Sequence, residues 1–164
     1  MVYDYFDTGL IGTLTLVADD QGLRYIEFET ARYPRDLSPE WRRDTAFFKT
    51  AKAQLKAYFS GKNDRFDLPL APQGTPFQQR VWQTLRTIPY GSVVSYGWVA
   101  EHIGNPKAVR AVGGANARNP LPVVIPCHRV IGSNGTLTGF GGGLDVKARL
   151  IELEKNRLAK IGRA

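Results

Sequence analysis

The sequence places its single cysteine beside a histidine and an arginine, in the run Pro126-Cys127-His128-Arg129. Cationic or hydrogen-bonding neighbours lower the pKa of a thiol and so supply the nucleophilic thiolate. On an extended strand adjacent side chains point to opposite faces, so there Cys127 and His128 would couple only through a turn or a bridging water. The competing interpretation is a small, buried apolar cysteine. These residues alone leave both interpretations open.

A second candidate site is a predicted helix over residues 107–117, which is rich in small residues: Ala111, Gly113, Gly114, Ala115 and Ala117. A glycine inside a helix costs about 1 kcal/mol relative to alanine. Two in succession therefore indicate either close packing of another helix or close approach of a ligand backbone. Arg110 in the first turn and Arg118 just beyond the end suit a phosphate backbone or a narrow groove.

Further helices of the second half must position both sites. Thr75-Pro76-Phe77-Gln78 combines a capping box with proline at the first helical position, which predicts a helix over residues 75–88. Ser95 opens a short helix over residues 96–103, and Asn105-Pro106 caps the helix over residues 107–117. Two short helices joined by a glycine-containing turn predict a helix-turn-helix. A last helix, over residues 144–157, carries Glu154, which is either a partner for an arginine or histidine or a solvated surface residue.

A glycine-rich loop over residues 132–143 lies between the cysteine segment and the last helix. It lacks the Lys-Ser/Thr ending of a phosphate-binding loop. We therefore interpret it as a mobile wall of a substrate pocket, or as a plain flexible hairpin.

The first 70 residues predict a separate small domain. Residues 2–7, 13–18 and 23–28 have the alternation of short strands and form an antiparallel meander, with a turn at residues 19–22. A helix over residues 41–59 and one more short strand at 66–68 follow. Prolines and a glycine crowd together between residues 69 and 76, which predicts a linker and divides the chain into residues 1–70 and 71–164.

Charge follows the same division. The chain has a formal charge of +7, but residues 1–70 carry a net charge of −1 and residues 71–164 a net charge of +8. Such an asymmetry indicates either a half that binds a polyanion, with nucleic acid as the first candidate, or a basic solvated surface. One cysteine and two histidines exclude a disulfide framework and argue against structural zinc. We expect no metal, no cofactor and no membrane contact, because no signal peptide or long apolar stretch is present, and a reducing cytoplasm as the compartment.

The chain closely resembles the O6-alkylguanine-DNA alkyltransferases, which repair DNA by direct reversal. It has several of the motifs of that family, in the order in which they occur along the family's chains. They are residues 125–130 (IPCHRV), 89–91 (PYG), 95–96 (SY), 110–115 (RAVGGA), 119–120 (NP) and 139–143 (GFGGG). The resemblance implies an α+β fold. A small N-terminal antiparallel sheet with a helix, ribonuclease H-like, precedes a mostly helical, winged helix-turn-helix-like C-terminal domain.

The resemblance also implies a mechanism. Cys127 would accept the alkyl group from guanine O6 irreversibly, once per molecule, and O4-alkylthymine is a further possible substrate. His128 would act as general base through a water, Glu154 would orient His128, Asn119 would support the preceding turn, and Tyr96 would donate a proton toward guanine N3. The nucleophile, base and orienting carboxylate follow the logic of an activated nucleophile.

The partner implied is double-stranded DNA containing O6-alkylguanine, with no obligate protein partner. The helix over residues 107–117 would lie in the minor groove, and Arg110 would fill the space left by the flipped guanine. The DNA-binding residues implied are Ser95, Arg110, Ala111, Gly113, Gly114, Ala115 and Arg118.

The base pocket implied consists of Asn116, Pro122, Val130, Phe140 and Gly141. Phe140 stands where some members have Tyr, Gly141 where some have Ser, and Asn116 where some have a larger apolar residue. We therefore expect a roomier pocket that accepts alkyl groups larger than methyl.

Two other functions remain as alternatives. One is a protein of the same fold that binds alkylated DNA without chemistry, against which the presence of Cys127 argues. The other is a thiol hydrolase, which would have no need of a helix-turn-helix in a half with a charge of +8.

Overall fold

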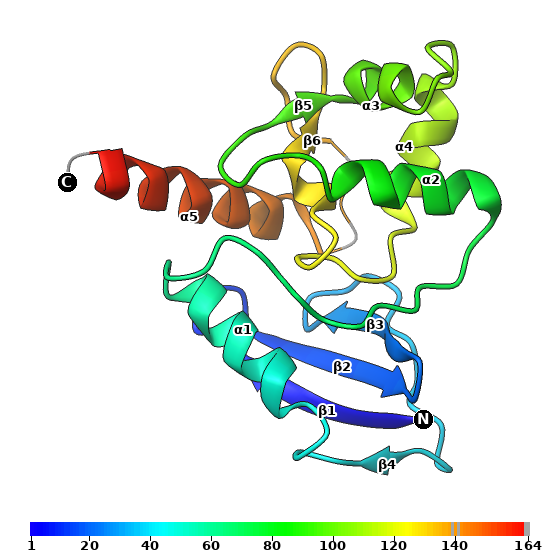
Figure 1. Cartoon of the computed structure of the whole chain (residues 1–164), viewed down its shortest axis with the longest axis vertical. Coiled ribbons are helices and arrows are strands. Elements are labelled where there is room, and N and C mark those ends of the chain that lie inside the picture. Colours follow the sequence, from blue (N-terminus) through cyan, green and yellow to red (C-terminus); the bar gives the residue numbers. More distant parts are fainter. Residues whose placement is uncertain (139, 141, 163–164) are drawn as a thin grey trace.

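A computed structural model describes residues 1–138, 140 and 142–162, without the side chains of residues 159–162. The fold is mixed α+β, as predicted: a small N-terminal sheet with one helix on it, and a helical C-terminal domain above the sheet (Figure 1).

The N-terminal sheet has the order β3-β2-β1-β4. The antiparallel meander β1 (Val2–Asp7), β2 (Thr13–Asp19) and β3 (Gly22–Phe28) agrees with the prediction. β4 (Arg42–Arg43) was predicted as helix and instead pairs parallel with β1. The reason is the free edge of β1, because Tyr3 and Met1 offer carbonyl groups that accept backbone hydrogen bonds from Asp44 and Arg42.

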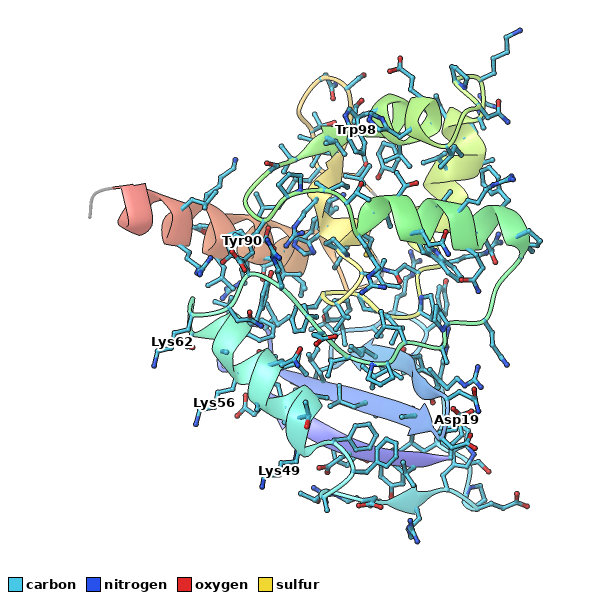
Figure 2. All side chains as sticks on the ribbon, in the orientation of Figure 1. Asp19, Lys49, Lys56, Lys62, Tyr90 and Trp98 are labelled. Atoms are coloured by element: carbon cyan, nitrogen blue, oxygen red, sulfur yellow. The ribbon has the colours of Figure 1, made fainter. Side chains whose placement is uncertain are left out.

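Helix α1 (Lys49–Phe59) covers one face of this sheet and begins eight residues later than predicted. Its buried side chains are Ala51, Leu55 and Tyr58. Lys49, Lys56 and Lys62 project from the opposite side into solvent (Figure 2). The strand predicted at residues 66–68 is absent, and a single bridge between Leu23 and Leu70 takes its place.

Three helices of the C-terminal domain pack against one another: α2 (Pro76–Leu85), α3 (Tyr96–His102) and α4 (Val109–Ala117). The Thr75–Gln78 capping box of α2 is present as predicted, and the Ser95 hydroxyl caps α3. α4 begins two residues later than predicted, after Ala108 and without a side-chain cap, so the proposed Asn105-Pro106 cap is wrong.

Two short strands, β5 (Val94–Ser95) and β6 (Val130–Ile131), pair in parallel and place the cysteine segment beside the start of α3. The last helix, α5 (Leu144–Gly162), extends beyond the predicted end at residue 157. None of the helices in the described part of the chain is sufficiently long and apolar to span a membrane.

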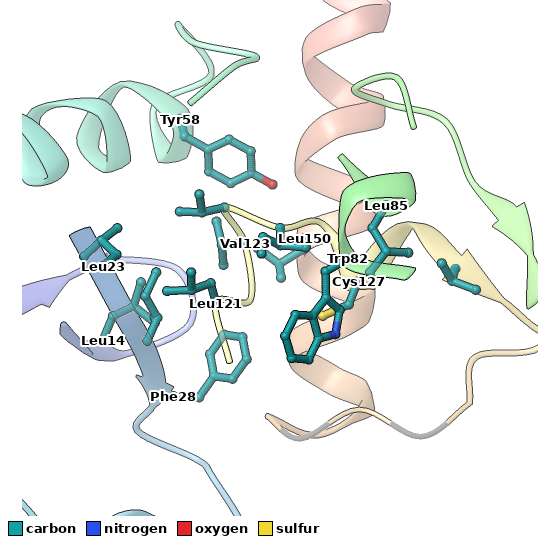
Figure 3. Close-up of a cluster of buried hydrophobic side chains, with 14 of the residues drawn as sticks. Leu14, Leu23, Phe28, Tyr58, Trp82, Leu85, Leu121, Val123, Cys127 and Leu150 are labelled. Carbon is teal, nitrogen blue, oxygen red and sulfur yellow. The ribbon is translucent and has the colours of Figure 1, made fainter. Parts of the chain in front are cut away.

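One hydrophobic core joins the sheet to the helical domain. Figure 3 shows Leu14 and Phe28 from the sheet, Trp82 from α2 and Leu150 from α5 gathered around Leu121. The site described below therefore rests on elements of both parts of the chain.

Candidate active site

Cys127 begins a short 3-10 helix, η1 (Cys127–Arg129), and only 4 % of its surface is exposed. The expected extended conformation begins only at Val130, the first residue of β6, so the alternation of Cys127 and His128 across a strand does not apply. The Cys127 amide donates to the Ile125 carbonyl at 2.8 Å, and the Asn116 side-chain amide lies 3.4 Å from the Cys127 carbonyl. A turn, rather than a strand, therefore presents the thiol.

The segment before Cys127 is held in a tight turn by Asn119. Its side-chain oxygen accepts a hydrogen bond from the Leu121 amide at 3.0 Å, and its amide donates to the Ile125 carbonyl at 2.8 Å. Val123, inside this turn, has φ of +75°, a conformation that a β-branched residue rarely adopts. Such strain persists only where surrounding contacts enforce it. Asn119 supplies two of these contacts, at the position that the sequence assigned to support of the turn.

His128 and Glu154 form a buried pair, with 2.6 Å between Nε2 and Oε2. A carboxylate at Nε2 fixes the proton on that nitrogen and leaves the lone pair on Nδ1. Nδ1 is buried and has no hydrogen-bond partner among the described atoms. Burial lowers the pKa of His128 more than the bond to Glu154 raises it. The imidazole is therefore neutral near pH 7 and has an unoccupied basic nitrogen.

Glu154 is the centre of a larger network. Burial alone would raise its pKa, but hydrogen bonds from His128 and Arg129 hold the pKa well below the ordinary range. Arg129 donates from Nε to Oε1 at 2.8 Å and from Nη2 to Oε2 at 3.0 Å, while the Tyr58 hydroxyl and the Gly91 amide donate to the same carboxylate. The surface alternative for Glu154 is wrong. It is an ionised, buried carboxylate whose charge Arg129 balances.

The thiol of Cys127 is protonated at rest. Burial raises its pKa to about 11, although the Asn119 side chain and the nearby Lys147 ammonium both lower it. Lys147 itself is buried on α5 and donates to the Thr138 carbonyl at 3.0 Å. The site therefore needs a base to remove the thiol proton, and His128 is the basic group next to Cys127 in the chain.

A cavity of about 570 Å³ opens onto Cys127. Its lining includes Asn116, Asn119, Pro122 and Phe140, all assigned to the site from the sequence. Val130 is fully buried and does not line it, nor does Tyr96, and Gly141 lies outside the described residues. Trp82, which Figure 3 labels together with Cys127, also lines the cavity.

Tyr96 and Ser95 lie at the start of α3. The Tyr96 hydroxyl is 2.8 Å from the Thr138 hydroxyl, so the glycine-rich loop holds it in place. The Ser95 hydroxyl accepts from the Trp98 amide at 3.0 Å. Ser95 thus has a structural role as a helix cap whether or not it touches DNA.

The outer face of α4 is smooth and basic. A methyl group added at Gly113 or at Gly114 would meet nothing within 4 Å, so the close packing of another helix is the wrong explanation for these glycines. Arg110, Ala111 and Arg118 are exposed, whereas Ala115 is buried and its carbonyl accepts a hydrogen bond from the Trp82 indole at 2.9 Å. α4 therefore offers an open surface on which a ligand backbone fits closely.

Two site residues, Tyr58 and Lys147, were not predicted from the sequence, and Arg129 is the arginine with which Glu154 pairs. Lys147 gave a signal, because it lies three residues before the apolar Leu150 and so on the same face of the last helix. The cavity wall contributed by residues 26–35 gave none, because it comes from the other part of the chain. Within the described ranges no group of three or more His, Cys, Asp or Glu side chains is arranged to hold a metal ion.

Comparison with known proteins agrees with this geometry. Residues 1–72 match the family model described as 6-O-methylguanine DNA methyltransferase, ribonuclease-like domain, and residues 76–156 match the DNA binding domain of the same name. The methylated-DNA–protein-cysteine methyltransferase of Methanosarcina acetivorans is 48 % identical over 154 residues, which cover 94 % of this chain and 98 % of that protein.

The protein of the same name from Mycobacterium tuberculosis is 48 % identical over 147 residues, covering 90 % of this chain and 88 % of its own length. The crystal structure of M. tuberculosis OGT in complex with DNA superimposes with a TM-score of 0.88 at 46 % identity, over 96 % of this chain and 94 % of that one. With both halves matched and nearly half of all positions identical, the chain belongs to the methylated-DNA–protein-cysteine methyltransferase family.

Proposed function

We propose that this chain repairs DNA by direct reversal, as a methylated-DNA–protein-cysteine S-methyltransferase. It transfers the alkyl group from O6-alkylguanine in duplex DNA to Cys127. The observation that carries the proposal is a cysteine that lines a cavity of about 570 Å³ and is directly followed by a neutral, buried histidine that a carboxylate orients. The names of relatives at 48 % identity support the same activity.

The first step is removal of the thiol proton. Nδ1 of His128 is the basic nitrogen, because Glu154 occupies Nε2. We assign the proton transfer from Sγ to Nδ1 through a water molecule. The imidazolium that forms is stabilised by the ionised Glu154 carboxylate, 2.6 Å away, whereas Arg129 keeps that carboxylate from taking the proton itself.

The second step is displacement at the alkyl carbon. The Cys127 thiolate attacks this carbon, a C–S bond forms, and the bond between carbon and O6 breaks with its electron pair on the guanine. Tyr96 donates a proton toward N3 and so neutralises the leaving base. A thioether has no nucleophile to release it, so each molecule reacts once.

DNA engages α4 in this proposal. The exposed Arg110 and Arg118 and the open surface at Gly113 and Gly114 suit a narrow groove. Because O6 of a stacked guanine is out of reach, the base flips into the cavity and Arg110 takes its place in the duplex.

The proposed function also includes the domain division, the oligomeric state and the compartment. The chain divides near residue 70 into a scaffold domain and the DNA-binding, alkyl-accepting domain. The protein acts as a monomer in the cytoplasm, where reducing conditions keep Cys127 as a free thiol.

A mass measurement tests the activity. The protein is incubated with a duplex that carries one O6-methylguanine, and a gain of one methyl group per chain is expected, absent from Cys127→Ser. Tight binding without a change in mass would indicate a binding protein instead, and repeated turnover of an ester or peptide would indicate a hydrolase.

A comparison of two substrates tests base flipping. Arg110→Ala should slow repair of the duplex far more than reaction with free O6-benzylguanine, because only the duplex requires the base to leave the stack. Equal losses with both substrates would contradict this role of Arg110. Reaction of the unsubstituted chain with O6-benzylguanine also tests whether the pocket accepts alkyl groups larger than methyl. Fast methyl transfer without any detectable reaction with benzylguanine would contradict the prediction of a roomier pocket.

A further inference from the structure

Two residues of the N-terminal sheet touch the wall of the cavity. Phe28, the last residue of β3, packs against Phe140 with 5.4 Å between ring centroids. The Thr30 hydroxyl, two residues later, donates to the Gly142 carbonyl at 2.6 Å. Both contacts join parts of the chain more than 100 residues apart, and both lie on the loop between β6 and α5.

The same loop is held from the other side by the helical domain. Thr138 bonds to the Tyr96 hydroxyl at 2.8 Å, and its carbonyl accepts from Lys147 at 3.0 Å. Between these contacts and those of Phe28 and Thr30 lies Phe140, which lines the cavity together with Cys127. Phe28 and Thr30 add contacts from the N-terminal part of the chain to those that the helical domain makes with this loop.

Gly142 shows how closely the sheet approaches. A methyl group at this position would lie 2.6 Å from Cδ2 of Phe28, a distance at which the ring or the loop must move. The Phe28 ring is itself buried, with 6 % of its surface exposed. Glycine at position 142 therefore allows β3 to press directly on the loop.

We infer that Phe28 and Thr30 are positioning residues that hold the Phe140 wall of the cavity in place for the alkylated base. The N-terminal sheet thus contributes to substrate recognition and is more than a scaffold. This inference rests on the proposed function for the identity of the base. Neither residue touches the reacting atoms, so both act through the loop.

The test measures recognition separately from chemistry. In a Cys127→Ser background, affinity is measured for a duplex with one O6-methylguanine and for the same duplex undamaged. Thr30→Val, which removes only the hydroxyl donor, should lower the preference for the methylated duplex about two- to tenfold, the usual effect of one hydrogen bond. Affinity for the undamaged duplex should not change.

Matched controls separate positioning from general stability. Thr87→Val removes a hydroxyl that also donates to a backbone carbonyl at 2.6 Å, but at the end of α2. Phe28→Leu is compared with Phe48→Leu, a buried phenylalanine of the same core that does not line the cavity. We expect the preference to fall in Thr30→Val and Phe28→Leu and to persist in both controls. If all four variants kept the preference for the methylated duplex, or if all four lost it to the same extent, the inference would be overturned.

Kinetics in the native-cysteine background give the second readout. The DNA concentration at half-maximal transfer should rise in Thr30→Val while the limiting rate at saturation is retained. A fall in the limiting rate alone would show that Thr30 acts on the chemistry and contradict positioning. Absence of any transfer by the unsubstituted chain would overturn the proposed function, whereas the binding preference would still decide the inference.

Discussion

At the scale of single residues, the thiol of Cys127 combines burial with a reaction that requires a thiolate. Desolvation raises its pKa to about 11, and the neighbouring cation Lys147 offsets only part of this rise. A resting thiol protects the residue from adventitious electrophiles. The same burial means that the thiolate forms only when His128 takes the proton.

The raised pKa predicts the pH dependence of Cys127 labelling. Because the thiol is protonated below its pKa, the rate of reaction with iodoacetamide should rise about tenfold per pH unit from pH 7 to pH 10. An ordinary thiol would level off near pH 8.5 to 9. A plateau by pH 9 would contradict the raised pKa, and Lys147→Met should move the rise to still higher pH.

The buried carboxylate of Glu154 balances the charge of Arg129 and orients His128. Glu154→Gln leaves the buried Arg129 without its counter-charge, so the free energy of unfolding should fall by about 3–5 kcal/mol. Methyl transfer should fall as well, since His128 loses its orienting carboxylate. Glu152→Gln, two residues earlier and exposed, is the control for denaturant unfolding. Equal stability of the two variants would show that Arg129 does not depend on Glu154.

At the scale of elements, α4 carries a stability cost that its own packing does not explain. Gly113 and Gly114 lie inside the helix with open space around them. Alanine would fit at both positions in the free protein and would favour the helix. The proposed function accounts for both glycines, because it places a groove wall against this face in the bound state.

Alanine at either glycine of α4 should have opposite effects on stability and on DNA binding. Gly113→Ala and Gly114→Ala should each raise the free energy of unfolding by about 0.5–1 kcal/mol. Both should weaken binding to duplex DNA, because the added methyl group holds the helix away from the groove. Gly97→Ala in α3, where a methyl group meets only the Ser95 hydroxyl at 3.6 Å, is the control for helix stability. A gain in stability with unchanged DNA affinity would exclude α4 as the docking surface.

At the scale of the whole molecule, charge is divided as the function requires. Residues 71–164 carry a net charge of +8 and residues 1–70 a net charge of −1. Arg129 is buried in an ion pair with Glu154, whereas Arg110 and Arg118 are exposed on α4. Two exposed cations of the second half, Arg110 and Arg118, therefore lie on the surface proposed for the duplex.

The distribution predicts a steep dependence of DNA affinity on salt. Each phosphate contact releases a counterion, so three contacts would weaken binding about 40-fold between 50 and 200 mM salt. Reaction with free O6-benzylguanine has no such contacts and should be nearly independent of salt. Duplex affinity that does not change over this range would show that the basic half is not the binding surface.

The sequence by itself determined the family, the meander, the helix starts at Thr75 and Ser95, and the identity of the acceptor cysteine as a prediction. These features depend on local patterns: alternation, capping residues and short motifs. It was wrong where a distant partner decided the outcome. Residues 42–43 became β4 because β1 had a free edge. For Glu154 the sequence left open a partner role and a surface role, and the contacts with Arg129 and Tyr58 decided in favour of the partner role.

Only the tertiary structure decided what surrounds Cys127. Burial sets the pKa of the thiol, and burial depends on residues from α2, α5 and the N-terminal sheet packed together. The open face of α4 likewise depends on the tertiary arrangement, in which no described atom from outside α4 lies within 4 Å of a methyl group added at its glycines. Contacts such as Thr30 with Gly142 join residues 112 apart in the chain, and no local pattern encodes them. Capping residues, strand alternation and short motifs can therefore be predicted from the sequence, whereas desolvation and long-range contacts arise only in the folded chain.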